Sequence, residues 1–147
     1  MQLLDELADV YLDNNLEHPY YLDLQTGLVE LDVGEGISGV PGIDWDDEAN
    51  DDRYLDIPKI TSDEAYYIRV QFAKRTESDP DDKLFDALDR QRPFRGFKDV
   101  LYELDLWDEW NAFERHYAIE QVQDWMRQNE LSYEKLAQLF AENFPYN

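Results

Sequence analysis

Basic residues are concentrated in one short segment of this chain. Four of its 13 lysine and arginine residues lie among residues 90–98, which read Arg-Gln-Arg-Pro-Phe-Arg-Gly-Phe-Lys. Pro93 is typical of the first position of a helix, so the arginines are expected beside a helix N-terminus. Unpaired backbone amides, the helix dipole and forked guanidinium donors all favour a phosphate or a carboxylate there. The segment therefore predicts an anion-binding or partner-binding site made of Arg90, Arg92, Phe94, Arg95, Phe97 and Lys98.

The same segment also has a purely structural interpretation. Phenylalanines at helical spacing are typical of a core, and arginines can pair with the acidic side chains that this chain holds in excess. The two interpretations differ in one observable property. Binding requires guanidinium groups that gather together, whereas the structural interpretation requires each of them to be neutralised by an adjacent carboxylate.

The acidic stretch between Asp44 and Asp52 is a second candidate, because Ca²⁺ prefers several oxygen ligands. Its spacing does not match an EF-hand loop, which needs glycine at the sixth position and glutamate at the twelfth. Counted from Asp44, those positions hold Ala49 and Leu55. We therefore expect no metal site, while weak divalent binding by this stretch stays open. Its carboxylates are Asp44, Asp46, Asp47, Glu48, Asp51 and Asp52.

Residue patterns for catalysis are absent from the sequence. The chain has no cysteine, and Phe113 stands where a di-iron Glu-x-x-His motif ending at His116 would need its glutamate. Neither a Gly-x-Ser-x-Gly elbow nor a Gly-x-x-x-x-Gly-Lys phosphate loop occurs. Carboxylates are so frequent that no pair stands out as an acid and a base. We expect no catalytic residues and no cofactor.

The composition is strongly acidic, with 35 acidic and 13 basic residues and a net charge of −22. Such a field repels nucleic acid and anionic membranes. The content of 43% apolar and 14% aromatic residues is too high for a chain kept disordered by its charge. The charge is also uneven, because residues 1–56 contain 16 acids and one base, a net charge of −15.

The length of 147 residues suits one domain with one core. The first residues lack the basic stretch and the apolar run of a signal peptide. No apolar window approaches the length of a membrane span. We therefore expect a single cytoplasmic domain over residues 1–147, without membrane contact.

Hydrophobic patterning predicts one helix and a small sheet in the first 57 residues. Apolar residues at positions 3, 4, 7, 8, 11 and 12 form one helical stripe. Residues 20–24 and 28–33 flank a Thr26-Gly27 turn and predict a β-hairpin. Residues 53–57 resemble a third strand, which Pro58 ends or places at a sheet edge. Residues 34–52, rich in glycine and aspartate, predict a mobile acidic loop.

The remainder of the chain is predicted to be helical. Each helical stripe there begins after a capping residue or a proline, and the longest stripe covers residues 107–129. The fold class is therefore α+β, with a small antiparallel sheet of two or three strands packed with five or six helices. The predicted helix starts are Thr61, Asp79, Pro93, Trp107 and Ser132.

Four segments together resemble a known family. They are residues 21–27, Tyr-Leu-Asp-Leu-Gln-Thr-Gly; Ile57-Pro58; residues 84–98, which contain Phe-Arg-Gly-Phe-Lys; and the tryptophan-rich helix that ends with Trp125. In these segments the chain resembles the bacterial Uncharacterised Protein Family 0158, over about residues 20–131. The Phe-Arg-x-Phe-Lys motif is the most specific part. The resemblance implies a shared fold and no particular chemistry, and the loop at 34–52 looks like an elaboration of the family pattern.

Together these observations predict a soluble, non-enzymatic binding or regulatory module with its contact surface around Arg90–Lys98. Its partner would be an unidentified protein or an anionic ligand rather than nucleic acid. One alternative is an acidic decoy, in which the surface of residues 1–56 mimics nucleic-acid phosphate and binds a basic protein. The other alternative is a carboxylate-dependent hydrolase of unrecognised type.

Overall fold

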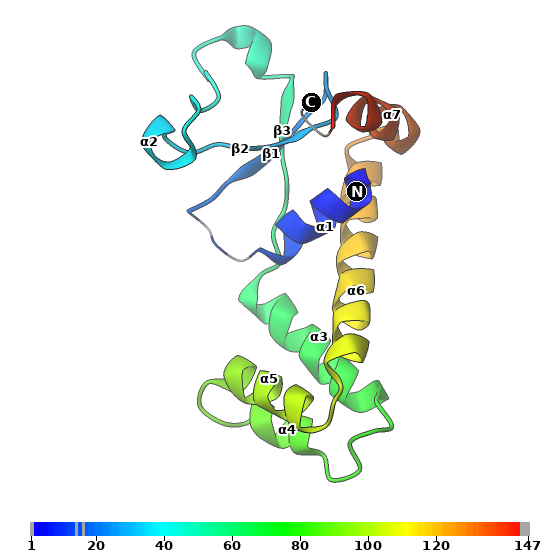
Figure 1. The fold of residues 1–147 in the computed structure, drawn as a ribbon. Coiled ribbons are helices and arrows are strands. Elements are labelled where there is room, and N and C mark those ends of the chain that lie inside the picture. The colour runs from blue at the N-terminus through cyan, green and yellow to red at the C-terminus, as the bar shows by residue number, and fades with distance from the viewer. Residues whose placement is uncertain (1, 14, 16, 145–147) are drawn as a thin grey trace. The chain divides into compact units, whose positions relative to one another are not determined.

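The computed structural model describes residues 2–13, 15 and 17–144, and within them it shows seven α-helices and a three-stranded antiparallel sheet (Figure 1). The predicted α+β class with a small sheet is confirmed. The helix beyond the predicted six is the short α2 (Glu35–Ser38). No helix within the described ranges is both long and apolar enough for a membrane span.

The chain divides into two compact units. The sheet unit comprises the residues up to Lys59 together with those from Ala118 onward, and the helical unit comprises Ile60–Tyr117. The helical unit holds 14 acidic and 9 basic residues, a net charge of −5, whereas the sheet unit holds 21 and 4, a net charge of −17. The organisation as one domain stays a prediction.

The sheet is built around β1 (Tyr20–Asp23). This strand pairs antiparallel with β2 (Val29–Leu31) on one side and with β3 (Tyr54–Asp56) on the other, so the order is β2-β1-β3. Leu22, at the centre, is fully buried and lies opposite Val29 and Leu55. The predicted hairpin is confirmed, and β3 is an edge strand, as the proline after it indicated.

Three helical segments complete the sheet unit. They are α1 (Leu3–Leu12), α7 (Tyr133–Asn143) and the part of α6 (Trp107–Gln128) from Ala118 onward. The hairpin turn lies directly against α7, where the Asn143 side chain donates to the carbonyl of Thr26 at 3.1 Å. Each of these helices buries the apolar stripe that the sequence predicts. The best-buried side chains include Leu3, Leu7, Ala118, Val122, Leu136 and Phe140.

A buried carboxylate ties the end of β1 to the start of β3. Asp23 has no exposed surface and accepts from Arg53 through both of its oxygens, at 3.0 Å from Nε and 2.7 Å from Nη2. The backbone amide of Gln25 donates to the same carboxylate at 2.9 Å. Burial disfavours the charged form of Asp23, but these hydrogen bonds outweigh it and place its pKa below the ordinary value.

The segment 34–52, predicted as a mobile acidic loop, contains two short helical turns, α2 and the 3₁₀ turn Glu48–Asn50. Its middle is attached to the sheet by Trp45. The indole Nε1 of Trp45 donates to Asp32 at 2.9 Å, and its ring packs edge-on against Tyr21 and Tyr54 at centroid distances of 5.0 and 6.0 Å. The mobility of the segment stays a prediction, whereas this attachment was not foreseen.

The helical unit contains α3 (Ser62–Arg75), α4 (Lys83–Leu88), α5 (Pro93–Glu103) and the first part of α6. Thr61 caps α3 by accepting from the amide of Glu64 at 3.1 Å, as predicted. The aromatic core consists of Phe72, Phe97 and Trp110, whose rings meet edge-on at centroid distances between 5.1 and 6.3 Å.

The helix start predicted at Asp79, as a cap followed by Pro80 at the first helical position, is wrong by three residues, because α4 begins at Lys83. Asp79 is buried, and its carboxylate accepts from the amides of Lys83 and Leu84 at 2.9 Å each. It therefore caps the helix from outside, across the turn that contains Pro80. The sequence signal identified the capping residue correctly and misplaced the amides that it satisfies.

Candidate functional site

The basic segment forms the connection between two short helices and the first turns of the second one. Arg90 follows α4, and Arg92 is the residue before α5, in the left-handed conformation with φ of 55°. A positive φ is costly for a residue with a side chain, and here it reverses the chain between the helices. Pro93 occupies the first helical position, as predicted.

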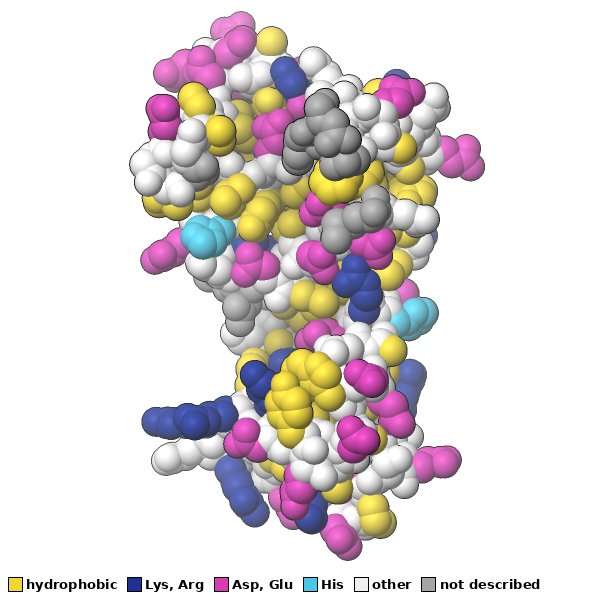
Figure 2. All heavy atoms as spheres, viewed as in Figure 1, with side chains coloured by type: hydrophobic (Ala, Val, Ile, Leu, Met, Phe, Trp, Pro, Cys, Tyr) yellow, Lys and Arg dark blue, Asp and Glu magenta, His cyan; other side chains and the backbone are white. Residues whose placement is uncertain are grey.

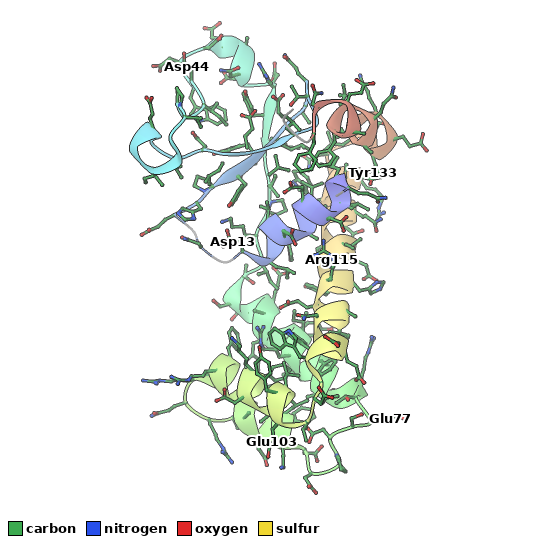
Figure 3. All side chains as sticks on the ribbon, in the orientation of Figure 1. Asp13, Asp44, Glu77, Glu103, Arg115 and Tyr133 are labelled. Carbon is green, nitrogen blue, oxygen red and sulfur yellow. The ribbon has the colours of Figure 1, made fainter. Side chains whose placement is uncertain are left out.

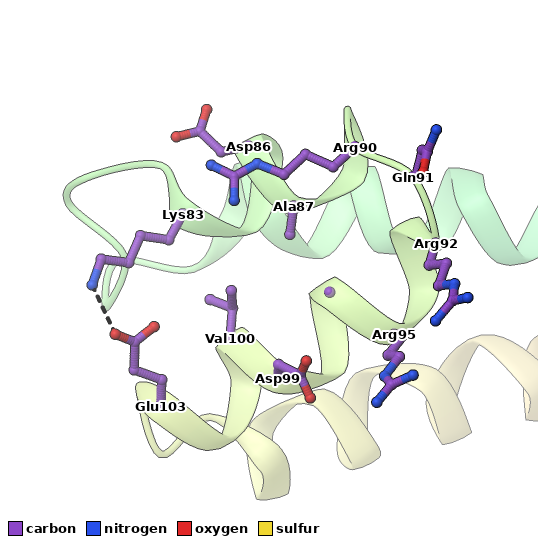
Figure 4. Close-up of a pocket in the computed structure, with 11 residues that line it drawn as sticks. Lys83, Asp86, Ala87, Arg90, Gln91, Arg92, Arg95, Asp99, Val100 and Glu103 are labelled. Atoms are coloured by element: carbon purple, nitrogen blue, oxygen red, sulfur yellow. Dashed lines mark hydrogen bonds and ion pairs between the residues drawn. The ribbon is translucent and has the colours of Figure 1, made fainter.

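A groove of about 620 Å³ runs between α4 and α5 (Figure 4). Small residues allow the two helices to approach, since a Cβ added to Gly96 would lie 3.4 Å from the Cβ of Ala87. Val100 lines the groove one helical turn after Gly96. The glycine of the Phe-Arg-Gly-Phe-Lys motif therefore has a packing role at the base of this groove.

One end of the groove is cationic. The side chains of Arg92 and Arg95 point to the same side at this end, whereas Arg90, which also lines the groove, extends from the turn after α4 toward Asp86 (Figure 4). All three are exposed, and within the described part of the chain none of their guanidinium groups forms a hydrogen bond or an ion pair. Lysine and arginine side chains also gather over α4 and α5 in the space-filling view (Figure 2).

The other end of the groove is neutralised. Lys83 donates to Glu103 at 3.1 Å, and this hydrogen bond raises the pKa of Lys83 above its ordinary value. Asp86 and Asp99 also line the groove. The lining therefore has four cations and three acids. Among the described residues, Arg90, Arg92 and Arg95 are the lining cations without an ion pair.

The two phenylalanines of the predicted site lie on a different face of α5. Phe97 is buried and Phe94 is half-buried. Both rings contact the guanidinium group of Arg69, whose Cζ lies 4.2 Å from the Phe94 centroid and 5.8 Å from that of Phe97, with Trp110 at 5.0 Å. Their position supports the structural interpretation for the phenylalanines, because they form the packing around an internal arginine.

Arg69 is an unusual internal cation. Its Nη1 donates to the carbonyl of Ala65 at 2.8 Å, while its buried Nε has no hydrogen-bond partner within the residues that the structure describes. Burial lowers the pKa of Arg69 from its ordinary value, and burial likewise raises the pKa of Glu114, against the opposing effect of the Arg69 charge. The two groups interact through space on the inner side of α3 and α6.

Lys98 does not line the groove. It is exposed, and its Nζ is 5.9 Å from the ring centroid of Trp107, which stacks on Tyr102 at 5.0 Å. Of the six residues predicted to form one site, the structure thus brings together Arg90, Arg92 and Arg95. Phe94, Phe97 and Lys98 do not line this groove.

Several groove residues were missed by the sequence interpretation. Asp99 and Glu103 follow Arg95 at four-residue intervals, so their position on its face was readable from helical spacing. Residues from α4 had no such signal, because only packing places that helix beside α5. The missed lining residues are Lys83, Asp86, Ala87, Gln91, Asp99, Val100 and Glu103.

The described residues contain no group of three or more histidine, cysteine or acidic side chains suited to hold a metal ion. Phe113, at the position of the missing di-iron glutamate, packs in the core against Phe72 and Trp110. The Tyr117 hydroxyl donates to Glu64 at 2.9 Å, which links α6 to α3. His18 pairs with the amide side chain of Asn15 at 3.1 Å.

Comparison with protein families gives a match over nearly the whole chain. A family model described as Uncharacterised protein family (UPF0158) matches residues 1–143, nearly the whole chain. No curated protein and no solved structure matches.

Proposed function

The chain belongs to the Uncharacterised protein family (UPF0158), and since that description assigns no activity, we propose from the groove itself that the protein is a non-enzymatic binding module. Its partner places an anionic group at the arginine end of the groove between α4 and α5. The residues that receive this group are Arg90, Arg92 and Arg95.

The observation that carries the proposal is the absence of ion pairs at these three arginines within the described residues. In a chain with 35 acidic residues, exposed arginines have many carboxylates available. Like charges gathered without partners repel one another, so the arrangement gains favourable interactions only when an anion is added. Guanidinium groups suit carboxylate and phosphate oxygens because their donors are planar and forked.

The acidic surroundings favour a small anionic group over an extended polyanion. Asp86 and Asp99 line the same groove, and the whole chain carries a charge of −22. An extended polyanion such as nucleic acid would run past these carboxylates and be repelled. The ligand that fits is a segment with one or two adjacent anionic groups on an otherwise neutral or basic protein.

A defined peptide tests this function. A fluorescent peptide with two adjacent glutamates in a neutral sequence should bind the protein, and Arg92→Glu/Arg95→Glu should weaken that binding about a hundredfold. Each charge-assisted hydrogen bond contributes ~1.5–3 kcal/mol, and ~1.4 kcal/mol corresponds to a factor of ten in Kd. Fluorescence polarisation measures both values.

The matched control is Lys74→Glu/Lys135→Glu, which changes the net charge equally at two exposed lysines outside the groove. It should leave the Kd within about twofold, and the same peptide with glutamines should not bind. Equal weakening by the two double variants would show that only the overall charge matters and would contradict the placement of the site.

A second candidate function is supported by the charge of the sheet unit. Its net charge of −17 with only four cations makes it a suitable surface for a basic protein, as the acidic-decoy alternative requires. No observation on the described residues specifically favours the hydrolase alternative, which stays a prediction.

A further inference from the structure

Exposed apolar side chains are concentrated in one short part of the sheet unit. Six large hydrophobic side chains are exposed among the described residues, and three of them lie within nine residues of sequence: Ile37 at 74%, Val40 at 59% and Trp45 at 41%. We call these three the apolar patch. Exposed apolar residues beside a groove are typical of interaction sites, whereas scattered ones need no explanation, and Val40 lines such a groove.

One member of the patch, Trp45, is held on the sheet. Asp32 accepts from the amide of Ile43 at 2.9 Å and from the indole of Trp45 at 2.9 Å, so one carboxylate fixes both ends of the short stretch between them. A Cβ on Gly42 would lie only 2.7 Å from the same carboxylate. The exposed side chains therefore belong to a segment that is bound to the sheet at its centre.

A groove of about 440 Å³ adjoins the patch. Its walls come from the edge strand β2, through Val29 and Leu31, and from the facing segment, through Val40 and Ile43. An apolar side chain of a partner can enter this groove and contact aliphatic side chains on both walls.

The rim of the patch is acidic throughout. Residues 30–52 contain nine acidic residues and no lysine or arginine. The next two cations in the sequence are engaged, since Arg53 binds Asp23 and the Lys59 Nζ donates to the carbonyls of Asn15 and His18. Figure 3 shows Asp44 between α2 and the following 3₁₀ turn, and acidic side chains predominate over this region in Figure 2.

We infer that the apolar patch and its groove are a docking site for a basic amphipathic helix of another protein. Apolar side chains of that helix contact Ile37, Val40 and the groove, while its lysines and arginines face the acidic rim. Charge complementarity selects this occupant, because a second copy of the chain and an anionic membrane both carry the charge of the rim and are repelled. The inference is independent of the arginine groove in the helical unit.

This site differs from a decoy that works by charge alone. Attraction between exposed charges decays over about 10 Å at 0.1 M salt and about 3 Å at 1 M salt. Apolar contacts are not weakened in this way. Binding at the patch should therefore retain a component at high salt that a purely electrostatic mimic lacks.

The test uses a fluorescent synthetic helix of about 15 residues, with lysines on one face and leucines on the other. Fluorescence polarisation at ~0.5 M salt should show binding of this peptide, and Ile37→Ser/Val40→Ser should raise its Kd about tenfold, as expected for the loss of two partly buried aliphatic side chains. A sister peptide with serines in place of the leucines should bind the wild type at least about tenfold more weakly. It should bind the wild type and the double variant equally.

The matched control is Tyr67→Ser, which removes an exposed side chain of the helical unit, 56% accessible, and should leave the Kd unchanged. Thermal melts by circular dichroism should coincide for the three proteins, since all the altered side chains are exposed. Equal affinity of the leucine and serine peptides would overturn the inference, and so would an unchanged Kd in the double variant. A result of either kind leaves the arginine groove unaffected.

Discussion

Replacing Gly27 with alanine is expected to lower the free energy of unfolding by about 4 kcal/mol. Gly27 has φ of +72°, which alone disfavours a side chain by ~1–2 kcal/mol. Its added Cβ would also lie 2.6 Å from the carbonyl oxygen of Leu136 and 2.6 Å from the amide nitrogen of Phe140. Both atoms are backbone of α7, so the helix must move away from the hairpin and expose part of its buried face. Urea unfolding measures the loss.

The control for this variant is Gly36→Ala. No atom lies within 4 Å of a Cβ at Gly36, and its φ is not in the left-handed region. Alanine also favours the helical conformation of α2 by up to ~1 kcal/mol. Stability should therefore be unchanged or slightly higher. If Gly27→Ala unfolded at the same urea concentration as Gly36→Ala, the close contact between the hairpin turn and α7 would be wrong.

The second large effect is expected for Asp23→Asn, with a loss of about 3 kcal/mol. The asparagine amide keeps the size of the side chain but removes the negative charge of the carboxylate, whose two oxygens accept hydrogen bonds from Arg53. Breaking a buried ion pair on one side costs ~3–5 kcal/mol. The lower end applies here, because the Arg53 side chain is 29% exposed and can recover some hydration. Urea unfolding of single and double variants with Arg53→Met gives the coupling between the two residues.

The same carboxylate makes stability depend on pH. Its pKa in the folded protein is below the ordinary value of 3.8, so Asp23 stabilises the fold above about pH 4 and the contribution is lost as the pH falls through the folded pKa. The asparagine side chain of the variant does not titrate. The difference in unfolding free energy between wild type and Asp23→Asn should therefore narrow as the pH is lowered from about 7 to about 3.

Asp56→Asn is the matched control, because Asp56 is an exposed residue of the neighbouring strand β3. We expect a change within ~0.5 kcal/mol, as for most surface substitutions. A difference between wild type and Asp23→Asn that stayed constant with pH would contradict the assignment of the acid dependence to Asp23.

Local signals predicted the elements well. The helical stripe of α1, the Thr26-Gly27 turn, and the caps at Thr61 and Ser132 all act over four residues or fewer, and the structure confirms them. The start of α4 was wrong because Asp79 reaches its amides across a turn. These amides belong to Lys83 and Leu84, four and five residues after Asp79.

The candidate site was predictable only in part. Composition identified the basic segment, and Pro93 located the helix start beside it. Helical spacing places Arg95 on a different face of α5 from Phe94 and Phe97, so this separation was implicit in the sequence. The role of Arg69 was not implicit, because its neighbours at helical spacing, Ala65, Phe72 and Ala73, place it beside the apolar stripe of α3 but do not show which aromatic rings of α5 and α6 surround it.

The amino-acid sequence by itself determined which segments are helices and strands, where most of them begin, and where the few cations are concentrated. These properties depend on residues within a turn or two of one another. Only the tertiary structure decided that α4 lies along α5 to form the arginine groove, and that Trp45 attaches the acidic segment to the sheet. The reason is physical: both arrangements depend on the shapes of side chains that are distant in sequence, such as Ala87 against Gly96 and Trp45 against Tyr21 and Tyr54.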